Sequence, residues 1–269
     1  MAYGMTGKNV SIAWMEAVEV LLRARNGEMV NLAVTVENPV EEDTGIRASL
    51  DAFVEEQRRR TAGIERVSTV ANTIFPTAFY RASLGTRARD HLYAMERRGR
   101  RVSRRRNPSG TYFERFVAWP ASGGEFNQLE RAVGRLVAAR ERSQKRGNAY
   151  EFGLVSMSDD ETSDDVTLPV YGPGVDNRIM GFPCLSHISL TLLDGRLHMT
   201  ALYRNHHFIS RAYGNYLGLG RLLSFMARES GWDIGELMCV SSHADAEIGR
   251  GGAFGIGRVR DLLAKCHGD

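Results

Sequence analysis

The sequence predicts an α+β fold in which a mixed β-sheet is flanked by helices. Stretches with helical spacing of apolar residues and stretches with alternating apolar residues follow one another along the chain. Two alternating stretches, 188–193 and 196–204, are joined by Asp194-Gly195, which is a strong signal for an antiparallel hairpin. The chain has neither a glycine-rich phosphate loop nor a dinucleotide-binding fingerprint, which argues against a doubly wound parallel sheet.

The N-terminal half predicts four helices and one strand. Leu129, Val133 and Leu136 recur at helical spacing and make the fourth helix the clearest of them. Pro76 interrupts any helix across 67–80, because proline lacks the N–H group that a helix needs. The helices are expected over 11–25, 46–60, 87–100 and 126–142, and the strand is expected over 29–36.

The rest of the chain predicts further strands around one long helix. Beside the hairpin, strands are expected over 150–157 and 237–243, helices over 216–229 and 258–266, and an aspartate-rich loop over 158–180. Gly231 ends the long helix, since glycine is the usual residue after a helix C-terminus. No repeat or linker interrupts the pattern, so 1–269 is expected to form a single domain.

The composition is that of an ordinary globular protein, with 43% hydrophobic and 25% charged residues. No apolar stretch reaches the length of about 18 residues that a membrane span needs, and the N-terminus lacks the pattern of a secretory signal. Cys184, Cys239 and Cys266 are too few and too scattered for a disulfide framework or a zinc knuckle. We therefore expect a cytoplasmic protein without a membrane partner.

Positive charge is concentrated in one segment. The net charge is +3, but Arg81 to Arg106 contains ten arginines and no lysine. Such a cluster suits phosphate or carboxylate groups, and it equally suits a solvated basic face. Because aromatic residues are not interleaved with the arginines over most of the segment, no specific nucleic-acid partner is expected.

Four features follow one another between 181 and about 240. They are Pro183-Cys184, the hairpin, Arg204-Asn205 at its end, and Asn215 just before the long helix. In this order and spacing they resemble the thymidylate synthases, and Asn127-Gln128-Leu129 resembles the family's Asp-Gln-Leu helix start. The resemblance implies the thymidylate synthase fold and a homodimer formed through the face of the sheet.

The resemblance also implies a reaction. The thiolate of Cys184 would add to C6 of a pyrimidine nucleotide monophosphate and make C5 nucleophilic toward a one-carbon unit carried by 5,10-methylenetetrahydrofolate. A thiol with a pKa of about 8.5 is little ionised at neutral pH, and a neighbouring guanidinium lowers that pKa. Arg204, which matches the family's phosphate-binding arginine, could do both. Asn215 matches the residue that reads the pyrimidine amide edge, and asparagine suggests a uracil-type base.

Further site residues follow from the same resemblance. The positions expected to bind substrate are Asn205, Arg25, Lys145, Arg146, His243 and Asp245, and those expected near the folate are His207 and Arg211. Lys145 and Arg146 match a place from which family dimers supply arginines to the partner subunit, and Arg104 to Arg106 compete for that role. His207 replaces an aspartate of the family, and Arg211 replaces a glycine.

Three hypotheses follow. The first is a methyl- or hydroxymethyltransferase acting at C5 through a Cys184 adduct. The second is a nucleotide-binding protein that has lost folate chemistry, as the replacements at His207 and Arg211 would allow. The third is a metal-assisted enzyme, because His243, Asp245 and Glu247 alternate and would share one face of a strand. The first hypothesis needs no metal.

Overall fold

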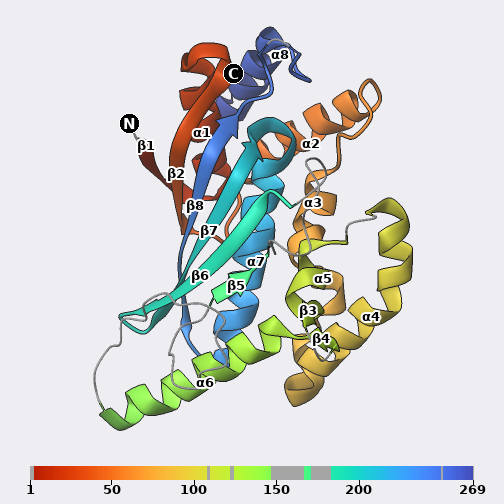
Figure 1. Cartoon of the computed structure of the whole chain (residues 1–269). Helices are drawn as coiled ribbons and strands as arrows, with labels where there is room; N and C mark the ends of the chain where they lie inside the picture. Colours follow the sequence, from red (N-terminus) through yellow and green to blue (C-terminus); the bar gives the residue numbers. More distant parts are fainter. Residues whose placement is uncertain are drawn as a thin grey trace.

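The computed structural model describes residues 3–107, 110–121, 124–146, 167–170, 183–249 and 251–268. It confirms the α+β class: a mixed six-stranded sheet packs against helices (Figure 1). In this described part of the chain no helix is both long and apolar enough to cross a membrane.

The strands of the main sheet lie in the order β1-β2-β8-β7-β6-β5. The pairs β1–β2 and β7–β8 are parallel, and the other neighbours are antiparallel. The strands are β1 (Tyr3–Asn9), β2 (Glu28–Asn38), β5 (Thr167–Pro169), β6 (Leu185–Leu193), β7 (Arg196–His207) and β8 (Asp233–Asp245). A separate ribbon pairs β3 (Trp119–Ala121) with β4 (Gly124–Phe126).

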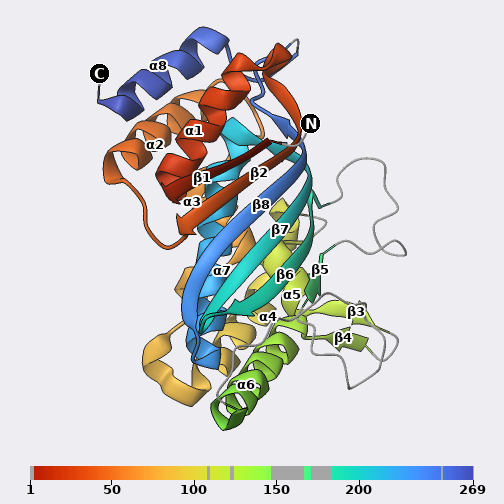
Figure 2. The ribbon, with the colours of Figure 1, turned by 90° about the vertical axis from the view of Figure 1, so that its left-hand side faces the viewer.

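The helices cover one face of this sheet. They are α1 (Val10–Arg23), α2 (Thr44–Arg58), α3 (Val67–Ile74), α4 (Ala88–Arg106), α5 (Tyr112–Val117), α6 (Gln128–Arg146), α7 (Tyr213–Ser230) and α8 (Ile256–His267). Figure 2 looks onto β8, β7 and β6, with α7 behind them. Short 3₁₀ turns lie at Arg25–Gly27, Thr77–Phe79 and Ala82–Arg87, and a π-helical turn, η4 (Phe208–Ala212), leads into α7.

The predicted hairpin is confirmed as β6 and β7. Asp194 and Gly195 both have positive φ, 50° and 77°, as the tightest hairpin turns require. The side chains of Leu197, Met199 and Ala201 alternate into the core as expected. On the opposite face of the sheet, no helix of the described residues packs, and large apolar side chains such as Leu202 and Met238 are exposed there.

Helix α7 is held close to α3 by glycines. A Cβ atom at Gly214 would lie 2.6 Å from the Val70 side chain, and one at Gly218 would lie 2.8 Å from the Ala71 carbonyl oxygen. Only glycine permits this approach. The helix ends at Gly231 (φ 76°), as predicted.

The other predicted elements hold with small shifts of their ends, and a few elements were not predicted. The strand β1 was missed, and so were the short α5, β3 and β4. The expected loop over 158–180 contains strand β5 where it is described, because Thr167–Pro169 pairs with β6. The strand expected over 150–157 lies outside the described residues.

Candidate functional site

Cys184 and Arg204 are neighbours across the start of the β6–β7 hairpin. The backbone N–H of Arg204 donates to the carbonyl oxygen of Cys184 at 2.9 Å, and the Arg204 guanidinium donates to the carbonyl oxygen of Pro183 at 2.7 Å. Both side chains are half-buried. The hairpin register therefore brings together the two residues that the sequence pattern paired.

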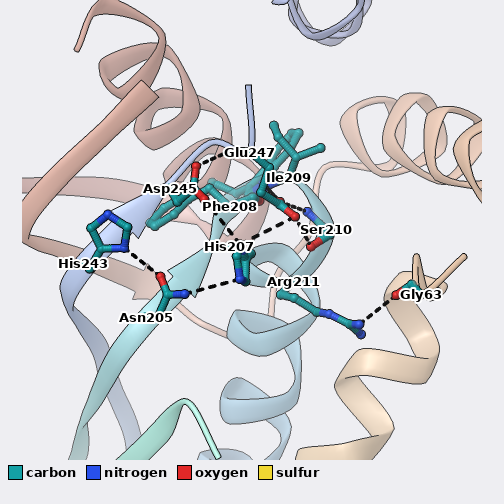
Figure 3. Close-up of polar contacts among 11 residues, drawn as sticks. Gly63, Asn205, His207, Phe208, Ile209, Ser210, Arg211, His243, Asp245 and Glu247 are labelled. Carbon is teal, nitrogen blue, oxygen red and sulfur yellow. Dashed lines mark hydrogen bonds and ion pairs between the residues drawn. The ribbon is translucent and has the colours of Figure 1, made fainter. Parts of the chain in front are cut away.

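Two further side chains, those of Tyr112 and Arg211, interact electrostatically with the Cys184 thiol. Tyr112, the first residue of α5, accepts the backbone N–H of Leu185 with its hydroxyl at 3.4 Å. Its pKa is raised to about 12, first by burial and then by the thiol of Cys184, whereas Arg211 lowers it. Arg211 in η4 donates to the carbonyl oxygen of Gly63 at 2.9 Å, which fixes the direction of its guanidinium (Figure 3).

The pKa of Cys184 corrects one expectation. Burial raises the pKa of the thiol above its ordinary value, and the guanidiniums of Arg204 and Arg211 lower it by less. The guanidinium of Arg204 thus favours the thiolate form of Cys184 as expected, and the guanidinium of Arg211 adds to this effect. The desolvation of the thiolate outweighs both, so the group is mainly a thiol at neutral pH.

The turn η4 is held at its N-terminus by Glu247. One carboxylate oxygen accepts the backbone N–H groups of Ile209 at 3.1 Å and Ser210 at 2.8 Å, and the other accepts the Ser210 hydroxyl at 2.6 Å (Figure 3). From the other side, the Trp14 indole N–H donates to the Phe208 carbonyl oxygen at 2.7 Å. These bonds satisfy backbone groups that a helix start leaves without partners.

Glu247 does not share a strand face with His243 and Asp245, contrary to the alternation in the sequence. Strand β8 ends at Asp245, and Glu247 has a φ of 57°. Its backbone N–H turns back onto the Asp245 carboxylate at 2.6 Å, so its own carboxylate points at η4. Among the residues that the structure describes, no group of three or more His, Cys, Asp or Glu side chains is placed to hold a metal ion.

Asn205, His207 and His243 form a polar chain across the ends of β7 and β8. The Nδ1–H of His243 donates to the Asn205 amide oxygen at 2.8 Å, and the Asn205 amide nitrogen lies 3.4 Å from Nε2 of His207. The other ring nitrogen of His207 lies 3.6 Å from the Asp245 carboxylate and 3.7 Å from that of Glu247. Figure 3 shows these side chains beside Arg211.

Asn215 lies on the first turn of α7 and faces His206 rather than His207. Its amide nitrogen is 3.0 Å from Nε2 of His206, and Nδ1 of the same ring is 3.0 Å from the hydroxyl of Ser241. His206 is two residues beyond Arg204 on β7, about 7 Å along the strand. Asn215, Arg204 and Cys184 therefore belong to one region of the molecule.

The remaining predicted phosphate ligands are less closely tied to this region. Arg25 is exposed in a turn whose Gly27 accepts a backbone hydrogen bond from Ala246 at 2.9 Å, at the same end of the sheet as Asp245. Lys145 and Arg146 belong to the last turn of α6, but their side chains lie outside the described part of the chain.

Some arginines of the segment 81–106 form ion pairs that stabilise the fold. Arg100 donates to Glu96 at 2.8 Å and to Glu125 at 2.5 Å, and Arg104 pairs with Glu114. The contacts with Glu125 and Glu114 hold α4 against β4 and α5. Arg97 and Arg101 are exposed on the outer side of the helix.

The sequence interpretation missed several of these residues. Tyr112 and Ser241 carry no local signal, because their positions near the site depend on long-range packing. His206, which contacts Asn215, was not among the predicted site residues. The capping role of Glu247 could not be predicted from the sequence, because it depends on where β8 ends.

No protein-family profile matches the chain. Three archaeal relatives, each named "Putative thymidylate synthase", align with parts of it. The protein from Methanosarcina acetivorans is 30% identical over 94 residues, that from Methanosarcina mazei is 29% identical over 94, and that from Methanothermobacter thermautotrophicus is 30% identical over 79.

These alignments support a distant thymidylate synthase-like relationship. They cover 35% of this chain for both Methanosarcina proteins and 29% for the third. The chain spans 43% of the length of each Methanosarcina protein and 36% of the Methanothermobacter protein. The relationship therefore concerns a segment, and the activity of the whole chain is a matter for proposal.

Proposed function

We propose that this chain is a thymidylate synthase-like transferase that adds a methyl or hydroxymethyl group at C5 of a pyrimidine nucleotide monophosphate. The observation that carries the proposal is the hairpin pairing that places Arg204 beside Cys184, where the guanidiniums of Arg204 and Arg211 both lower the pKa of the thiol. Paired guanidiniums beside a thiol suit a nucleophile that meets an anionic substrate. The similarity to proteins named as thymidylate synthases supports the same chemistry.

Each residue has a defined task in this proposal. The Cys184 thiolate adds to C6 of the base, and the electron pair of the C5–C6 bond makes C5 nucleophilic. Arg204 binds the phosphate and favours the thiolate. Asn215 pairs with the amide edge of the base. C5 would then form a bond to the methylene carbon of the donor as the bond from that carbon to the donor nitrogen breaks, and the C5 proton would leave. Expulsion of the thiolate would restore the enzyme when a hydride from the tetrahydrofolate, for a methyl product, or water, for a hydroxymethyl product, adds to that carbon.

The one-carbon donor would be 5,10-methylenetetrahydrofolate, which supplies the carbon unit when it is bound. The residues near the thiol fit such a carrier, because folates bear carboxylates and Arg211 offers guanidinium N–H groups. His207 is 39% exposed and can face the same ligand. Arg211 and His207 would hold and orient the donor beside C5.

A second candidate function is nucleotide binding without folate chemistry. One observation favours it: burial raises the pKa of Cys184. A cysteine that stays protonated would leave the pocket able to bind a nucleotide but slow to attack it. This candidate keeps the roles of Arg204 and Asn215 and removes that of the folate.

The proposal includes a homodimer formed through the open face of the sheet. Exposed apolar side chains on that face, such as Leu202 and Met238, would be covered by a second copy. In such a dimer, Lys145 and Arg146 would approach the nucleotide phosphate of the partner subunit. Sedimentation equilibrium would give the mass directly, and a monomer at micromolar concentration would contradict this part of the proposal.

Binding measurements separate the two candidates. Arg204→Ala should weaken binding of the monophosphate by about 10-fold or more and leave the free nucleoside nearly unaffected, because a hydrogen bond to a charged group contributes about 1.5–3 kcal/mol. Equal weakening of both ligands would show that Arg204 does not hold the phosphate. An absorbance difference spectrum with methylenetetrahydrofolate, recorded with nucleotide present, should show saturable binding for the transferase. Its absence would favour the binding protein.

A further inference from the structure

His206 is a buried histidine to which the proposed reaction gives no task. It is 1% exposed and its ring stacks on Tyr203, with ring centroids 4.0 Å apart and planes within 5°. The rings of Phe208 and Tyr216 close around it at 5.0 and 5.8 Å. A ring held in this way cannot turn over without disturbing the core.

The His206 ring lies between Asn215 and Ser241, and the Asn215 amide nitrogen faces its Nε2. The amide nitrogen of Asn215 can only donate, so Nε2 of His206 must accept from it. The ring proton then lies on Nδ1, which donates to the Ser241 hydroxyl. Burial lowers the pKa of His206 to about 3, so a second proton does not reach Nε2 at neutral pH.

In this arrangement the Nε2 lone pair of His206 holds the Asn215 amide nitrogen. With one N–H directed at Nε2, the amide presents its oxygen and its second N–H elsewhere. Turning the amide over would place its oxygen against the Nε2 lone pair. The packing of Gly214 against Val70 keeps this turn of α7 in place.

An acceptor and a donor held in a fixed order distinguish uracil from cytosine, because the two bases present these groups in opposite order. Uracil presents an N3–H donor beside the O4 acceptor, whereas cytosine presents an N3 acceptor beside an N4 donor. The oxygen and second N–H of Asn215 pair with the first pattern and oppose the second.

We propose that His206 determines base specificity, by holding the Asn215 amide in the orientation that accepts a uracil-type base and rejects cytosine. This inference rests on the proposed function, since it takes Asn215 as the residue that meets the base. His206 touches no substrate atom and is a positioning residue.

The test measures dissociation constants for uridine and cytidine monophosphates, as ribo- and deoxyribonucleotides, by isothermal titration calorimetry. The wild-type protein should prefer the uracil nucleotide by about 5- to 150-fold, the range expected for a two-bond contact with a base edge. His206→Phe keeps an aromatic ring but lacks Nε2, and its preference should fall to within about 3-fold. Both nucleotides should still bind, because the phosphate contacts are unchanged.

Two further variants make the test decisive. Ser241→Ala removes the acceptor that holds the proton on Nδ1, so its preference should also fall, and it serves if His206→Phe does not fold. Tyr203→Phe is the matched control. Its hydroxyl is buried and has no hydrogen-bond partner in the described part of the chain, so the preference should not change.

The outcomes separate this inference from the proposed function. Unchanged preference in His206→Phe and Ser241→Ala, or a wild-type preference for cytosine, would overturn the role of His206 while nucleotide binding stands. If no pyrimidine nucleotide binds to the folded wild-type protein, the proposed function fails, and the inference fails with it.

Discussion

Replacing Glu247 by alanine should destabilise the protein strongly, because one carboxylate caps the start of the helix that carries Arg211 and Asn215. The substitution removes the acceptor of two backbone N–H groups, those of Ile209 and Ser210, and of the Ser210 hydroxyl. Each buried donor left without a partner costs about 1–3 kcal/mol. The two backbone N–H groups alone account for a loss of about 2–6 kcal/mol, or a fall in Tm of roughly 4–24 °C for a chain of this size.

Thermal and urea unfolding followed by circular dichroism would measure this loss. Glu236→Ala is the matched control, since Glu236 lies on β8, the strand that precedes Glu247, with an exposed side chain. Glu247→Gln should fall between the two, because its amide oxygen still accepts one or two of the bonds. If Glu247→Ala were within about 0.5 kcal/mol of the control, the assigned capping role would be wrong.

Two further predictions concern titrating groups. The rate of Cys184 alkylation by iodoacetamide should rise with pH to beyond the ordinary thiol pKa of about 8.5, because burial raises that pKa. Arg211→Leu should slow alkylation at pH 8 by raising the pKa further, and an identical pH profile would show that Arg211 does not act on the thiol. His206 binds its proton more weakly in the folded than in the unfolded chain, with a pKa of about 3 against 6.5. Stability should therefore fall as pH drops from about 6.5 toward 3, and this dependence should be shallower in His206→Phe than in Tyr203→Phe. Parallel curves for the two variants would contradict the low pKa.

Much of the sheet around the site was predictable because the signals were local. Asp194-Gly195 can adopt positive φ at both positions, and the alternation on either side fixes the register of the hairpin. That register is what places Arg204 beside Cys184. Gly231 ended α7 where the sequence predicted, since its φ of 76° suits glycine.

The surroundings of the thiol were not predictable, because they depend on contacts between distant segments. Arg211 acts on the Cys184 thiol from η4, a turn far from the hairpin start in the contacts it makes, and Glu247 reaches that turn only because its own backbone leaves the strand. The direction of the Cys184 pKa depends on how completely the thiol is buried. Charge alone, which is all that the sequence offers, predicted the opposite direction.

The central claim, that Cys184 attacks C6 of a pyrimidine nucleotide, is tested most directly by release of tritium from C5. Uridine and cytidine monophosphates labelled at C5, in ribo and deoxy forms, would be incubated with wild-type protein and with Cys184→Ser, with and without methylenetetrahydrofolate. The account predicts release from a uracil nucleotide that disappears in Cys184→Ser and is accelerated by the folate. No release from any nucleotide by the folded wild-type protein, or equal release by Cys184→Ser, would contradict it.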